Sequence, residues 1–107
     1  MRDKKLLDEA FVKLRILGYF AEQNWKCCQS CGWAAIPDHC AKKAVFYHAQ
    51  DADAIKKGMI DKKGLYIAWD GNGKEIVQVF NSVGLKTSWE GSKDTRILIL
   101  SQKENCA

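Results

Sequence analysis

The stretch LYIAWDGNGKEIVQVFNSVG, residues 65–84, decides the fold of this chain of 107 residues. Its first part, residues 65–69, is almost continuously apolar, which is typical of a strand buried on both faces of a sheet. Residues 70–73 form a tight connection. Four apolar side chains then recur at helical spacing: Ile76, Val79, Phe80 and Val83. The stretch therefore predicts a central strand followed by a crossover helix over residues 73–83.

A second helix is predicted at the start of the chain, over residues 3–17. Five apolar residues share one of its faces: Leu7, Ala10, Phe11, Leu14 and Leu17. Gly18 follows, and glycine is the usual residue just beyond a helix end. This helix is expected to lay its apolar face on a sheet.

Three more runs are rich in strand formers, at residues 44–49, 85–90 and 95–100. The last two are separated by a turn and should form a hairpin. Between the strands, residues 51–57 are predicted as a short helix. The result is an α+β fold with a sheet of about four strands, mixed or antiparallel, on which the N-terminal helix and the crossover helix pack.

Size and composition point to a single domain over residues 1–107, with the sheet in residues 44–100. Residues 19–43 show little periodicity and are expected to be an irregular cysteine-containing segment. The net charge is +4, from 17 basic and 13 acidic residues, and the two signs are interleaved. That balance does not favour a nucleic-acid partner, which usually requires a denser basic stripe.

No apolar run approaches the roughly 20 residues that span a bilayer, so no membrane partner is expected. The start of the chain lacks the apolar core of a secretory signal. We therefore expect a cytoplasmic protein, in a compartment where thiols stay reduced. An odd number of cysteines, five, also rules out a complete internal disulfide framework.

Cysteines gather in the segment CCQSCGW, residues 27–33. The spacing of Cys28 and Cys31 lets two thiolates hold one zinc ion from a tight turn. A closed zinc site needs two more ligands, for which Cys40 and His39 are the nearest candidates. Cys27 is expected to point elsewhere, because adjacent side chains diverge along an extended chain.

Three other interpretations of the cysteines stay open. Thiol redox chemistry needs a lowered thiol pKa, although no buried strand precedes this motif. A nucleophilic Cys28 or Cys31 could instead be activated by His48 as the base. The general behaviour of free cysteine favours a fourth interpretation, in which the thiols are small buried hydrophobes packed by Trp25 and Trp33.

Polar side chains cluster around the end of the run at residues 44–49. His48 and Gln50 share one face of the predicted strand, and Asp51 follows directly. These three residues are candidates for polar contacts to a ligand, and Trp33 is a candidate exposed binding aromatic.

Several motifs together resemble a family of small bacterial domains of unknown function. They are GYF at 18–20, CCQSCGWA at 27–34, FYHAQD at 46–51, GLYIAW at 64–69, the segment 84–91, which contains WEG, and RILI at 96–99. The resemblance covers roughly residues 15–100 and implies no activity. It does imply that the cysteine segment and the residues His48, Gln50 and Asp51 belong to one site.

These observations predict a non-enzymatic binding or interaction domain with a cysteine-stabilised loop, whose partner is a protein or a small ligand. The alternative is a thiol-dependent enzyme that uses Cys28 or Cys31 with His48. A weak nucleic-acid binder is a third interpretation.

Overall fold

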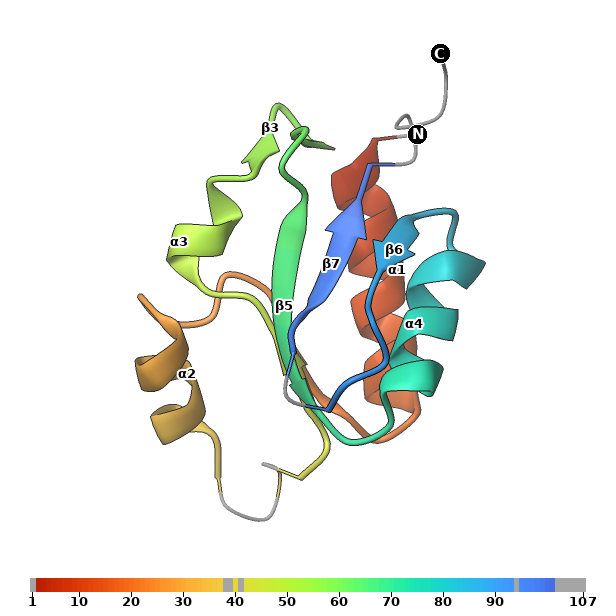
Figure 1. The fold of residues 1–107 in the computed structure, drawn as a ribbon. Helices are drawn as coiled ribbons and strands as arrows, with labels where there is room; N and C mark the ends of the chain where they lie inside the picture. The colour runs from red at the N-terminus through yellow and green to blue at the C-terminus, as the bar shows by residue number, and fades with distance from the viewer. Residues whose placement is uncertain (1, 38–39, 41, 94, 102–107) are drawn as a thin grey trace.

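A five-stranded sheet in the order β1-β2-β5-β7-β6 forms the centre of the molecule (Figure 1). The computed structural model describes residues 2–37, 40, 42–93 and 95–101. The strands of this sheet are β1 (Phe20–Glu22), β2 (Ala44–Phe46), β5 (Leu65–Asp70), β7 (Ile97–Leu100) and β6 (Lys86–Ser88).

The sheet is mixed: β1 runs parallel to β2, and every other neighbouring pair is antiparallel. Since β5 and β6 are both antiparallel to β7, they are parallel to each other, and α4 (Gly73–Ser82) connects them. The predicted α+β class, crossover helix and final hairpin are confirmed. The predicted number of strands was one too low, because β1 has only three residues and shows no recognisable alternation.

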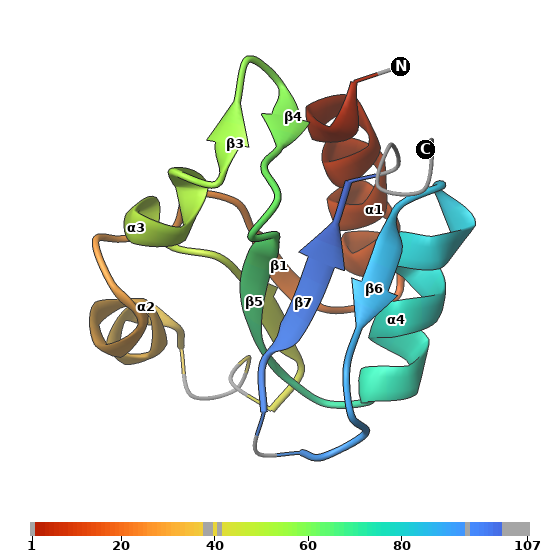
Figure 2. The same cartoon turned by 45° about the horizontal axis from the view of Figure 1, so that its top comes forward.

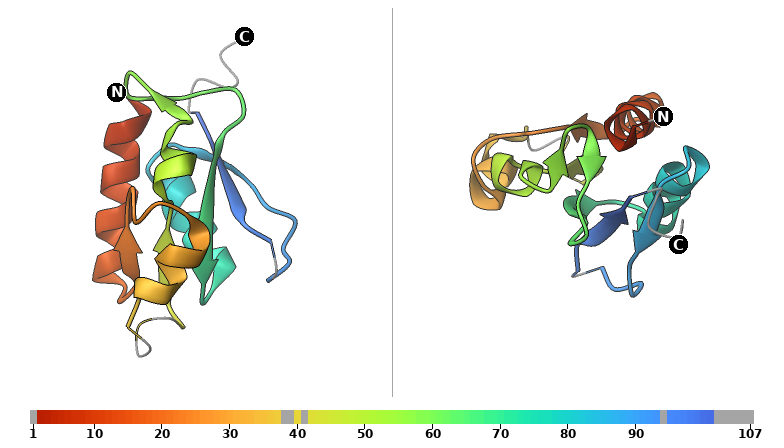
Figure 3. Two further views of the ribbon diagram at one scale, coloured as in Figure 1. Left: turned by 90° about the vertical axis from the view of Figure 1, so that its left-hand side faces the viewer. Right: turned by 90° about the horizontal axis from the view of Figure 1, so that it is seen from above.

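One face of the sheet is covered by α1 (Asp3–Ile16) and α4, which contact each other. Figure 3 shows these two helices side by side, with α2 (Gln29–Ala35) at the other end of the molecule. The largest fully buried side chains of this main core include Tyr47, Phe11, Phe80, Leu7, Leu14, Leu65, Ile67, Ile76, Ile97 and Ile99. None of the helices in the described part of the chain is long and apolar enough to cross a membrane.

The opposite face is only partly covered. A smaller apolar cluster of Ile36, Ala44, Phe46 and Ala68 lies there with Trp33 against it. Further along β5, the side chain of Tyr66 is 42% exposed. The expectation that this strand is buried on both faces was therefore wrong at Tyr66.

Residues 19–43 are more regular than predicted, since they contain β1 and α2. The predicted helix at 51–57 is also corrected. Only α3 (Ala49–Ala52) is helical, and a small hairpin of β3 (Ile55–Lys56) and β4 (Met59–Ile60) follows. Lys57 and Gly58 both have positive φ, 52° and 81°, which is the backbone of a two-residue hairpin turn. Lysine gives little sequence signal for such a turn.

Figure 2 shows the β3–β4 hairpin beside the start of α1. Asp3 ties the two together. This side chain is fully buried, and its Oδ2 accepts a 2.8 Å hydrogen bond from the backbone N–H of Ile60. The N–H of Lys4 also donates to the carbonyl of Gly58, at 2.9 Å. The first turn of α1 and the β3–β4 hairpin therefore hold each other in place.

Replacing Asp3 by Ala should destabilise the protein by about 1–3 kcal/mol, because a buried N–H loses its acceptor. Urea unfolding followed by circular dichroism measures this change. The control is Glu9→Ala, an exposed carboxylate on the same helix, which should change the unfolding free energy by less than about 0.5 kcal/mol. Equal effects of the two substitutions would contradict the role given to Asp3.

Candidate thiol site

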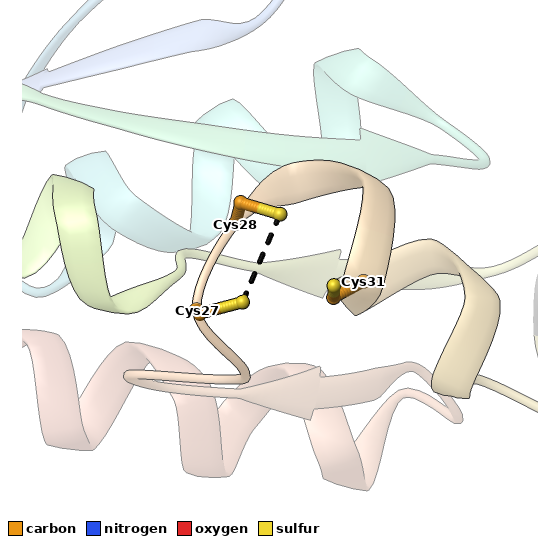
Figure 4. Close-up of side chains that lie close together, drawn as sticks. All are labelled: Cys27, Cys28 and Cys31. Carbon is orange, nitrogen blue, oxygen red and sulfur yellow. Dashed lines mark hydrogen bonds between the residues drawn. The ribbon is translucent and has the colours of Figure 1, made fainter.

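Three cysteines come together where the loop after β1 enters α2. The sulfur atoms of Cys27, Cys28 and Cys31 all lie within 4.8 Å of one another. The S–H of Cys27 contacts the sulfur of Cys28 at 3.9 Å. Figure 4 shows these two sulfurs on the same side of the loop, facing the side chain of Cys31. We call these three residues the thiol cluster.

The backbone around the thiol cluster changes conformation where the loop enters α2. Lys26 has a positive φ of 62°, and Cys28 is the extended residue just before α2. The carbonyl of Cys28 accepts the hydrogen bond of the Gly32 N–H, at 2.9 Å, which closes the first helical turn. The expectation that Cys27 points elsewhere was wrong, because its sulfur lies 3.9 Å from that of Cys28 and within 4.8 Å of that of Cys31.

Gly32 allows α2 to lie directly on the sheet. A Cβ atom at this position would be only 2.5 Å from the ring of Phe46. The indole N–H of Trp25 donates to the Gly32 carbonyl at 3.0 Å, and the ring of Trp33 meets that of Phe46 edge-to-face, with centroids 5.0 Å apart. Aromatic contacts on both sides of Gly32 thus hold the helix that carries the thiol cluster.

The loop before the cluster is hydrogen-bonded to the end of β2. The N–H of Trp25 donates to the carbonyl of Tyr47 at 2.8 Å, and the N–H of Ala49 donates to the carbonyl of Lys26 at 2.9 Å. The cysteine segment and the residues after β2 are therefore neighbours through their backbones. The side chains of the two segments, however, do not form one cluster.

Both ring nitrogens of the buried His48 face Asp51. Nδ1 accepts the backbone N–H of Asp51 at 3.3 Å, which caps α3, and Nε2 lies 3.1 Å from the Asp51 carboxylate. Because Nδ1 is an acceptor, Nε2 carries the proton. The same carboxylate oxygen accepts a 3.0 Å hydrogen bond from the guanidinium of Arg96. Among the described residues, His48 is not part of the group of converging ligand atoms that contains the three sulfurs.

The other predicted site residues are dispersed. Cys40 is half-buried and packs against the small apolar cluster, apart from the three sulfurs. Gln50 is exposed, and Trp33 is half-buried. His39 lies outside the described residues. The thiol cluster therefore differs from the predicted ligand set by including Cys27.

Exposure argues against the packing interpretation. Cys27 and Cys31 are exposed and Cys28 is only half-buried. Buried thiols that fill a core were thus a wrong expectation for this cluster. The small apolar cluster is built from Ile36, Ala44, Phe46 and Ala68, with Trp25 and Trp33 packed against it.

A sequence model of a protein family described as a domain of unknown function, DUF6891, matches residues 1–103. The chain belongs to this family. The expectation of a family without an assigned activity is confirmed. No curated protein and no solved structure matches this DUF6891 domain.

Hydrogen bonds at the thiols of this DUF6891 domain shift the pKa values of Cys28 and Cys31 in opposite directions. The backbone N–H of Cys31, followed by the S–H groups of Cys31 and Cys27, lowers the pKa of the Cys28 thiol. Donating its proton to Cys27 and Cys28 raises the pKa of the Cys31 thiol to about 11. Of these two thiols, Cys28 therefore has the lower pKa and loses its proton first as the pH rises.

Sequence reasoning missed two residues that shape the site. Gly32 gave a weak signal, because a glycine after a cysteine is typical of turns, whereas this one is a packing residue inside a helix. Arg96 gave none, because its partner Asp51 is 45 positions away. A contact of that kind becomes visible only when the strand order is known.

Replacing Gly32 by Ala should destabilise the protein by about 1–3 kcal/mol through overpacking against Phe46. Denaturant unfolding monitored by tryptophan fluorescence measures the change. Ser30→Ala, at an exposed position of α2, is the matched control and should be nearly neutral. If Gly32→Ala were as stable as the native protein, the close contact would not exist.

The rates at which Cys28 and Cys31 are alkylated should depend differently on pH. The lowered pKa of Cys28 means that its thiolate forms at lower pH than that of an ordinary cysteine, so Cys28 should react first with iodoacetamide. Cys31 should stay slow until the pH approaches about 11. Peptide mapping by mass spectrometry after short exposures gives the rate at each position. Faster labelling of Cys31 than of Cys28 at neutral pH would contradict the arrangement.

Proposed function

We propose that this DUF6891 domain is a binding domain that captures a thiophilic metal ion at the thiol cluster. The single observation that carries the proposal is the convergence of three sulfurs within 4.8 Å of one another, on two exposed cysteines and one half-buried cysteine. Thiolates are the ligands that zinc and other soft ions select. Exposure lets an ion reach the sulfurs directly from solvent.

The sulfur spacing supports this function. Zinc binds thiolate sulfur at about 2.3 Å, which places the sulfurs of a tetrahedral site about 3.8 Å apart. Cys27 and Cys28 are already 3.9 Å apart, and Cys31 lies within 4.8 Å of both. Small side-chain rotations would bring all three sulfurs onto one ion without moving α2.

A bound ion would cross-link the loop to α2, since it joins residues on both sides of the helix start. The fourth coordination position would be available to water or to a group from a partner. Trp33, two residues after Cys31 in α2, and the exposed Gln50 of α3 are the side chains we assign to partner contact. Because the thiols must stay reduced, we place the protein in the cytoplasm.

Thiol–disulfide exchange is the second candidate, supported by the accessible Cys28 sulfur at the helix start with Cys31 beside it. The Cys28 thiolate would attack a partner disulfide and release one partner thiolate. Cys31, after losing its proton to solvent, would then attack the Cys28 sulfur. The second partner thiolate leaves, and a Cys28–Cys31 disulfide remains.

His48 does not support the enzyme alternative, because its ring nitrogens are occupied by Asp51. A general base must lie within hydrogen-bonding reach of the proton that it removes. We therefore assign His48 a structural role at the end of β2.

Cadmium is a suitable probe, since bound thiolates give an ultraviolet charge-transfer absorption. Titration of the reduced protein should show one ion bound per chain. Structural zinc sites gain about 10–16 kcal/mol from four ligands, so losing one ligand should weaken binding by roughly a hundredfold. Ser substitutions of Cys27, Cys28 and Cys31, one at a time, should each have this effect.

Cys40→Ser is the matched control and should bind cadmium as the native protein does. If the cluster variants bind as tightly as this control, the proposed site is wrong. If the native protein binds no cadmium but forms a reversible Cys28–Cys31 disulfide with oxidised dithiothreitol, the exchange function is favoured instead.

A further inference from the structure

The thiol cluster offers three ligand atoms and, among the residues that the structure describes, no fourth one. The converging His, Cys, Asp and Glu atoms are the sulfurs of Cys27, Cys28 and Cys31 alone. Zinc and cadmium favour four ligands in a tetrahedron. The cluster therefore supplies one ligand fewer than these ions favour. Three sulfurs instead suit an ion that forms three bonds to sulfur.

We propose, resting on the metal-binding function above, that the cluster is a site for trivalent arsenic or antimony, taken up as the neutral hydroxide. These elements form three bonds in a pyramid, and their lone pair occupies the fourth direction. Three sulfurs on one side of a loop provide the base of that pyramid, and the lone pair would face the solvent.

Charge supports the same choice. Three thiolates carry three negative charges, so a monovalent ion leaves an anionic complex and a divalent ion leaves one excess negative charge. A trivalent ion gives a neutral complex. A neutral complex needs no cation beside it. The nearest cation along the chain, Lys26, has its Nζ over the ring of Trp25, 4.8 Å from the centroid.

The uptake step balances without any redox partner. Each of three As–O bonds of As(OH)₃ breaks and an As–S bond to Cys27, Cys28 or Cys31 forms. The proton of each thiol leaves on the departing hydroxide, so three molecules of water are released. Arsenic stays in the trivalent state, and sulfur is neither oxidised nor reduced.

The local backbone explains how three thiols reach one pyramid. Cys27 and Cys28 lie before α2, and Cys31 follows one helical turn later. The hydrogen bond from Gly32 to the Cys28 carbonyl fixes that turn, so the sulfurs are held in place before the ion arrives. Pre-organised ligands lose little conformational entropy on binding.

Native mass spectrometry of the reduced full chain with sodium arsenite tests the proposal. The expected adduct adds one arsenic and loses three hydrogens, which counts the thiols bound. Cys27→Ser, Cys28→Ser and Cys31→Ser should each abolish this adduct, whereas Cys40→Ser and Cys106→Ser should keep it. Circular dichroism of each variant verifies that it is folded.

Phenylarsine oxide provides an internal control, because it needs only two thiols. It should still bind each single variant of the cluster, which shows that the two remaining sulfurs are reactive. Loss of both arsenicals in a folded variant would contradict the three-sulfur site.

The outcomes separate the two proposals. Cadmium binding without an arsenite adduct, or an adduct that has lost only two hydrogens, overturns the arsenic site and leaves the metal-binding function standing. Failure of both cadmium and arsenite to bind overturns both. An arsenite adduct that survives all three cluster substitutions places the site elsewhere and overturns this inference.

Discussion

The thiol cluster depends on the contact between Gly32 and the ring of Phe46. A helix carries its backbone this close to an aromatic ring only where it has no side chain, and glycine provides that opening. The contact lets α2 pack directly against the face of β2 and β5, where the small apolar cluster lies. Because the first turn of α2 is thereby fixed, the directions of the Cys28 and Cys31 side chains are fixed too.

A second set of interactions holds the segment after β2, to which the cysteine loop is hydrogen-bonded. His48, two residues after β2, caps α3, and Asp51 joins it to Arg96, just before β7. The guanidinium of Arg96 also lies over the ring of Tyr66, 4.8 Å from its centroid. The Asp51 side chain is only 16% exposed, so these interactions are better shielded from solvent than a surface ion pair. They lie directly after Tyr47, whose carbonyl accepts the hydrogen bond of the Trp25 N–H from the cysteine loop.

The sequence predicted the parts of the fold that have long periodic patterns. The apolar stripe of α1 was correctly placed except at Leu17, which follows the helix and is 41% exposed. The strand–turn–helix from β5 into α4 was correctly placed too, because burial of one face requires such patterns. The short elements were not. The three residues of β1 and the Lys57–Gly58 turn become structured through neighbours distant in sequence. Local propensity carries no information about those neighbours.

The candidate site was predicted in the right segment but with a different composition. Cys28 and Cys31 follow from spacing alone, whereas the inclusion of Cys27 is known only from the positions of the three sulfurs in the folded chain. His48 resembled a catalytic or metal-binding residue by type. Its actual partner is Asp51, in the helix that His48 caps, and Asp51 in turn binds Arg96. Only the folded chain brings Arg96 to this pair.

X-ray absorption spectroscopy of the zinc-loaded protein tests the central claim most directly, because it counts the atoms around the metal by type. The convergence of Cys27, Cys28 and Cys31 predicts a first shell of three sulfurs and one lighter atom, oxygen or nitrogen. A shell made of oxygen and nitrogen alone would contradict it. So would a four-sulfur shell that requires Cys40, which the structure places in the apolar cluster.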